Sequence, residues 1–204
     1  MYFYTIAGQP PLRISRTFNN HVYPRFPNHQ KIPMKKIMCM VLAALVISLS
    51  AFIALTNWKV KEPYEVKFSG GKIHGEFKGL KAHIQFDKIH PEESKISASI
   101  DVNTIATGFF LKNSHAKDAL DAGKYPVISF RSTTVSKNGS SYKTTGNLTL
   151  KGVTKPVTIY FTFEDHGRSG IFRGSFKFAP KSFGITHDGT PDELTILLTV
   201  PVTQ

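Results

Sequence analysis

The chain has 204 residues, of which 41% are hydrophobic and 20% are charged, and its formal net charge is +12. All 14 acidic residues lie after Asn57, whereas six Lys and Arg precede it, so the part after Asn57 carries 20 basic against 14 acidic residues, or +6. That moderate charge is interleaved with apolar residues rather than clustered, which argues against nucleic-acid binding.

The N-terminal part of the chain has the composition of a leader and an export segment. Residues 1–33 contain several Pro and Asn and no hydrophobic periodicity, and we expect them to be disordered. Met34 and two lysines are followed by the uncharged run 37–55, which is typical of an export signal. This arrangement predicts that translation starts at Met34 and that residues 34–56 form a signal peptide or a membrane anchor.

Two fates are open for the apolar run 37–55. About 20 apolar residues can span a bilayer, so the run could remain as an inner-membrane anchor, whereas cleavage at the small residues Ser48 and Ser50 would release the domain. The basic residues precede the span, and the positive-inside rule then places the C-terminal domain outside the cytoplasm in both cases. We therefore expect a periplasmic or exported protein. Its only cysteine, Cys39, lies in this run, which excludes thiol chemistry and disulfides after it.

Residues 57–204 show the two-residue periodicity of strands that bury one face. In residues 95–102, for example, Ile96 and Ile100 share one face while lysine, serine and aspartate occupy the other. Turn-forming residues, such as Gly70-Gly71 and Asn138-Gly139, separate most of these segments. Many short strands at near-regular spacing predict a single antiparallel sandwich or barrel. Further strands are expected at 64–68, 72–77, 82–86, 127–135, 142–150, 157–163, 170–178 and 194–200.

Residues 106–123 break this pattern. They carry Ala, Leu, Lys and Asp at a density typical of a helix, and Gly123 is a suitable stop signal. We expect a short helix or an ordered loop that crosses one end of the sheet.

The sequence offers no catalytic or metal-binding motif. Nucleophile elbows, Walker loops and dinucleotide fingerprints are absent from it. The spacings between His74, His83 and His90 match neither a helical nor a strand-borne zinc motif. We therefore expect a protein that is not an enzyme and that has no metal and no cofactor.

Three stretches resemble the YceI-like family of exported lipid-binding proteins. Residues 146–157 are similar to its Gly-Asp-Leu-Thr-Ile-x-Gly-Val-Thr-x-x-Val signature, residues 124–132 to its Tyr-Pro-x-Ile-x-Phe-x-Ser motif, and residues 100–108 to a third pattern. The resemblance extends over about residues 58 to 203. It implies an all-β fold, a single antiparallel lipocalin-like barrel with a helix near one mouth. The interior of such a barrel would hold a polyisoprenoid or quinone-like lipid.

The phase of the strands then predicts which side chains would meet the ligand. The expected lining residues, each on the more apolar face of its strand, are Phe68, Phe77, Phe86, Ile100, Phe130, Phe161, Phe176 and Leu198. Phe109 and Phe110 are expected to form a lid, and His115 stands where the family has a histidine beside the crossing segment.

Two alternatives remain open at this point. The phenylalanines could fill the core of a ligand-free envelope barrel with a structural or interaction role, or the chain could be a small enzyme acting on lipids. The expected partners are the lipid ligand and, through residues 37–55, the membrane. The sequence is also compatible with a homodimer.

Overall fold

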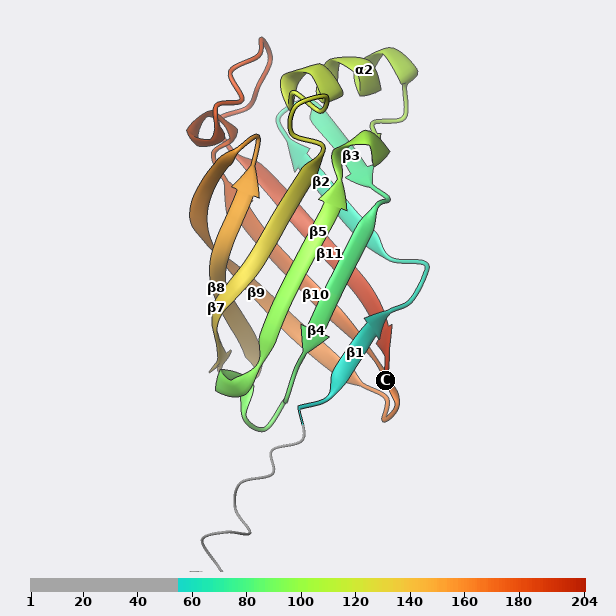
Figure 1. Ribbon diagram of the computed structural model, residues 1–204, viewed down its shortest axis with the longest axis vertical. Helices are drawn as coiled ribbons and strands as arrows, with labels where there is room; N and C mark the ends of the chain where they lie inside the picture. The colour runs from blue at the N-terminus through green and yellow to red at the C-terminus, as the bar shows by residue number, and fades with distance from the viewer. Residues whose placement is uncertain (1–54) are drawn as a thin grey trace, which may run out of the picture. The chain divides into compact units, whose positions relative to one another are not determined.

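The period-two segments form antiparallel strands of one sheet that closes on itself (Figure 1). The computed structural model describes residues 55–204, so the expected leader 1–33 and nearly all of the export segment 34–56 lie outside the described residues. Within the described residues no helix is both long and apolar enough to cross a bilayer. The elements are β1 (Asn57–Val60), β2 (Glu65–Gly70), β3 (Ile73–Phe77), β4 (Leu80–Gln85), η1 (Pro91–Glu93), β5 (Lys95–Asp101), η2 (Val102–Thr104), β6 (Ile105–Ala106), α2 (Phe110–Ala119), β7 (Val127–Asn138), β8 (Ser141–Leu150), β9 (Val153–Asp165), β10 (Ser169–Phe178), η3 (Pro180–Phe183) and β11 (Leu194–Thr203).

Eight strands make the closed wall, which confirms the predicted antiparallel barrel. They follow the order β1-β4-β5-β7-β8-β9-β10-β11, and β1 returns to β11 with Val60 opposite Val202. Closure gives each of these strands a paired neighbour on both sides, although the pairing of β9 with β10 covers only part of their length. Strands β2, β3 and β6 extend the sheet from the other end of β11, where Leu198 lies opposite Val66.

The wall divides at one end of the barrel, and this division forms its mouth. Strand β5 runs beside β7 as far as Asp101 opposite Val127. Beyond that pair the chain turns through η2 into β6, where Ile105 pairs with Phe77 of β3 instead. Helix α2 crosses this end of the barrel (Figure 1), as expected for the segment 106–123.

Two glycines of the signature 146–157 explain its local structure. Gly152 has φ 75° and Lys151 has φ 50°, so together they form the tight turn between β8 and β9. Gly146 lies inside β8. A Cβ built there would lie 2.6 Å from Cζ of Phe130, so the missing side chain leaves room for that ring.

One irregularity affects the phase of β7. The register with β8 shifts between Ser132 and Thr134, which is a β-bulge. As a result Phe130 and Val135 are both buried although they are an odd number of residues apart.

Candidate functional site

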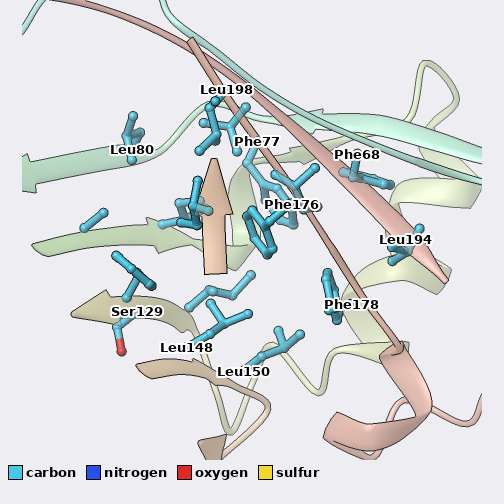
Figure 2. A pocket seen from close by; sticks show the side chains of 18 of the residues that line it. Phe68, Phe77, Leu80, Ser129, Leu148, Leu150, Phe176, Phe178, Leu194 and Leu198 are labelled. Carbon is cyan, nitrogen blue, oxygen red and sulfur yellow. The ribbon is translucent and has the colours of Figure 1, made fainter. Parts of the chain in front are cut away.

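The barrel encloses a cavity of about 280 Å³ whose walls are almost entirely apolar. Figure 2 shows Phe68, Phe176 and Phe178 among the side chains that surround it. The only lining residues with polar side chains are Ser129, Thr144 and Thr190. The hydroxyl of Thr144 donates to the carbonyl oxygen of Thr134 at 2.9 Å, so it is already satisfied within the wall. An apolar guest would therefore leave the hydroxyl of Thr144 paired, whereas a polar guest would find few hydrogen-bond partners on the wall.

Most of the residues expected to line the interior lie on the wall of this cavity. They are Phe68, Phe77, Ile100, Phe130, Phe161, Phe176 and Leu198. They come from β2, β3, β5, β7, β9, β10 and β11, and alternation within each strand places them on the inner face. Their contact with a ligand remains a prediction.

Phe86 has a different position from the one expected. It is 2% exposed and does not line the cavity, because it packs within an aromatic group at one end of the barrel. We call this group the floor cluster; its members are Trp58, Phe86, Tyr142, Phe161, Phe163 and Phe172.

The floor cluster closes the end of the barrel opposite to the mouth. Phe161 and Phe172 line the cavity, and the other four rings pack behind them. Trp58 and Phe163 meet edge to face at 5.0 Å, and the indole N–H of Trp58 donates to the carbonyl oxygen of Phe86 at 3.3 Å. The cavity is therefore closed at this end by packed rings.

Helix α2 contributes small and aliphatic side chains to the mouth, not its phenylalanines. Ala116, Ala119 and Leu120 line the cavity. Phe109 is 56% exposed and Phe110 is 75% exposed, and neither lines the cavity. Neither ring lies on the cavity wall in this structure, and their role as a lid stays a prediction.

His115 also lies apart from the cavity. It is an exposed residue of α2 and is absent from the lining. The helix is fastened at both ends by other groups. Near its start, the backbone N–H of Thr107 donates to Oδ1 of Asn113 at 2.7 Å, and at its end Nζ of Lys151 donates to the carbonyl oxygen of Ala119 at 2.9 Å.

Several further lining residues occupy positions that the strand and helix periods also indicate. Phe178 is two residues after Phe176 on β10 and therefore shares its face. Leu120 follows Ala116 by four residues, the spacing of one helical face.

Ionisable groups of the described residues lie outside the cavity, since none is among its lining residues. A hydrogen bond from Lys88 lowers the pKa of Asp165 on the outer surface. Burial opposes ionisation of Asp87, but hydrogen bonds from the N–H groups of Ile89 and His90 outweigh it, so the pKa of Asp87 is lowered. Residues 55–204 contain no group of three His, Cys, Asp or Glu that could hold a metal ion.

Comparisons with known proteins give one consistent family. The model of the YceI-like domain matches residues 54–203. A UPF0312 protein of Pseudomonas paraeruginosa is 37% identical over 139 residues, which are 63% of this chain and 72% of that protein.

Two solved structures have the same barrel. BcnA of Burkholderia cenocepacia is 25% identical, with a TM-score of 0.65 over 69% of this chain and 96% of its own. A domain from Saccharophagus degradans, described as a polyisoprenoid-binding domain implicated in plant cell wall breakdown, is 10% identical. Its TM-score is 0.53 over 72% of this chain and 97% of its own, a likeness that shows the fold alone.

Proposed function

The chain belongs to the YceI-like domain family, and on that premise we propose that its barrel binds a long apolar lipid, a polyisoprenoid or quinone-like molecule, without acting on it chemically. The observation that carries the proposal is the cavity of about 280 Å³ with walls that offer only three polar side chains. Such a wall favours an apolar ligand, because the hydrophobic effect drives its transfer from water into the cavity. The Saccharophagus degradans domain described as polyisoprenoid-binding supports the same ligand class.

Binding fits the cavity better than catalysis does. General acid–base and nucleophilic chemistry need ionisable or activated groups within hydrogen-bond reach of the substrate. Among residues 55–204, the cavity lining contains no such charged group and no histidine or cysteine. The polar side chains that do line it are hydroxyls of serine and threonine.

The test is mass spectrometry of lipids extracted from protein purified from its native host. We expect a long-chain isoprenoid or quinone at near-stoichiometric amounts. The blocking variant is Ala98→Phe, because Ala98 lines the cavity and a ring there would occupy the space of the ligand. This variant should carry less lipid than the wild type. Circular dichroism checks that the variant keeps its strands. If the wild-type protein carries no lipid and takes up none in vitro, the barrel is a structural module and the proposal fails.

We also propose that the barrel acts in the cell envelope. The support is the apolar run 37–55 behind Met34 and two lysines. N-terminal sequencing of protein from the native host tests this proposal. A start at Ala51 indicates cleavage and intact membrane-bound protein indicates an anchor, whereas soluble cytoplasmic protein that retains residues 1–33 would refute it.

A further inference from the structure

Two neighbouring strands of the barrel wall separate before they reach the mouth. The pairing of β9 with β10 runs from Asp165 opposite Gly170 to Tyr160 opposite Ser175. Strand β9 continues beside β8 down to Val153, and β10 continues beside β11 up to Phe178. We call the unpaired stretch between residues 153–159 and 176–178 the seam.

Side chains, not strand hydrogen bonds, close the seam. Phe178 packs edge to face on Phe183 of η3, with their ring centroids 5.4 Å apart, and Phe183 is 1% exposed. Val157 and Ile159 of β9 belong to the same buried cluster as Phe183. The closure therefore depends on a short 3-10 segment packed against β9, with no strand pairing across the gap.

The two sides of the seam are both hollow. Inside lies the cavity already described, and outside lies a surface groove of about 570 Å³ formed by β9, β10 and η3. Phe176 and Phe178 line both hollows. These two residues of β10 thus belong to the stretch of wall that lies between the interior and the outer groove.

The outer groove differs from the cavity in its chemistry. It carries the hydroxyls of Thr158, Ser175 and Ser182 and the side chains of two lysines, of which Lys177 is paired with Glu193 at 2.8 Å. Its apolar lining residues include Val157, Phe176 and Phe178. A hollow that combines apolar side chains with hydroxyls and lysines matches the polar end of a lipid.

A long ligand would extend out of the barrel, either at the mouth beneath α2 or through the seam. The floor cluster closes one end, and a cavity of about 280 Å³ is small compared with ligand pockets, which reach about 1,000 Å³. We propose that the seam is a lateral portal, through which the bound lipid passes between Phe176 and Phe178 so that its polar end lies in the outer groove. This inference rests on the proposed lipid-binding function.

The test compares a short and a long ligand on a matched pair of variants. Thr158 and Thr162 lie on β9 four residues apart, so both belong to the same face of the strand, but only Thr158 lines the groove. Affinities for farnesol and for undecaprenol are measured by displacement of a fluorescent fatty acid. Thr158→Trp should weaken the affinity for undecaprenol about tenfold, equivalent to about 1.4 kcal/mol, and leave the affinity for farnesol unchanged. Thr162→Trp should change neither affinity.

The possible outcomes separate the portal from the function. If Thr158→Trp binds undecaprenol as tightly as the wild type, the portal is refuted while lipid binding stands. If the wild type binds neither probe, the proposed function and the portal both fail. Should Thr158→Trp misfold, Ser182→Trp on η3 blocks the same groove and takes its place.

Hydrogen exchange gives an independent readout on the unaltered sequence. Undecaprenol should add protection to peptides covering residues 153–160 and 176–184, whereas farnesol should not. Equal protection by both ligands, or none by either at saturation, would contradict the portal.

Discussion

The rings of Phe86 and Phe161 meet edge to face at the closed end of the barrel, with centroids 5.7 Å apart and an interplanar angle of 68°. Phe161 faces the cavity on one side and this packed ring on the other. It is 6% exposed, so it behaves as a core residue although it touches the cavity. The floor of the site is thus also part of the structural core.

Replacement of Phe161 should therefore cost the free energy typical of a core phenylalanine. We expect Phe161→Ala to lower the free energy of unfolding of delipidated protein by about 3 to 5 kcal/mol. Phe176→Ala should cost only about 1 to 2 kcal/mol, because its half-buried ring faces space that is already empty. Urea denaturation measures both values, and equal losses would show that the cavity is not open in the delipidated protein.

Gly146 should tolerate no side chain. A Cβ there would approach the carbonyl oxygen of Arg131 to 2.4 Å and the ring of Phe130 to 2.6 Å, and β8 cannot shift without disturbing its two neighbours. We expect Gly146→Ala to destabilise the protein by about 1 to 3 kcal/mol. The control is Gly123→Ala, where nothing lies within 4 Å of the new Cβ. Thermal unfolding of the two variants should differ clearly, and a neutral Gly146→Ala would contradict this packing.

Helix α2 should act on the ligand through Leu120 and not through Phe110. Leu120 lines the cavity, whereas Phe110 is 75% exposed and does not. Phe110→Ser should change stability by no more than about 0.5 kcal/mol, as is usual for surface sites, and leave lipid affinity unchanged. Leu120→Ala should weaken lipid binding. Fluorescent-lipid titration distinguishes the two, and a strong loss in Phe110→Ser would support the lid hypothesis.

Asp87 should make the stability of the barrel sensitive to acid. Its carboxylate accepts from the N–H of Ile89 at 2.7 Å and from the N–H of His90 at 3.2 Å, which organises the turn at the closed end. These bonds lower its pKa against the opposing effect of burial. The contribution of Asp87 to the free energy of unfolding is thus fully present above its ordinary pKa of 3.8. It is lost as the pH falls through the lower pKa that Asp87 has in the folded protein.

The variant Asp87→Ala should show this dependence directly. We expect it to be less stable than the wild type by about 1 to 2 kcal/mol at pH 7. The difference should shrink as the pH falls below the ordinary value of 3.8. Asp188→Ala, at an exposed turn, is the control. A difference that stays constant from pH 7 to pH 2 would show that the carboxylate charge is not involved.

Local signals in the sequence accounted for much of the barrel. The alternation of Ile96 and Ile100 with polar residues predicted β5, and the Asn-Gly pair at 138–139 predicted the tight turn before β8. Both features depend on neighbours in the chain: the side-chain direction in a strand has a period of two, and a positive φ favours glycine. The same period placed Phe68, Phe130 and Phe176 on the inner face, where the cavity lies.

Only the tertiary structure decided how far along the barrel each inner residue sits. Phe86 and Phe77 each lie on the inner side, yet Phe86 packs in the floor cluster and Phe77 lines the cavity. The two-residue period of a strand gives the side of the sheet to which a side chain points, but not its position along the barrel axis. That position depends on the tilt and stagger of all the strands around the closed wall. The exposed position of Phe110 and the seam between β9 and β10 have the same origin. They depend on which distant segments meet, as Val157 of β9 and Phe183 of η3 meet in one buried cluster, and that choice is made by packing of the whole barrel.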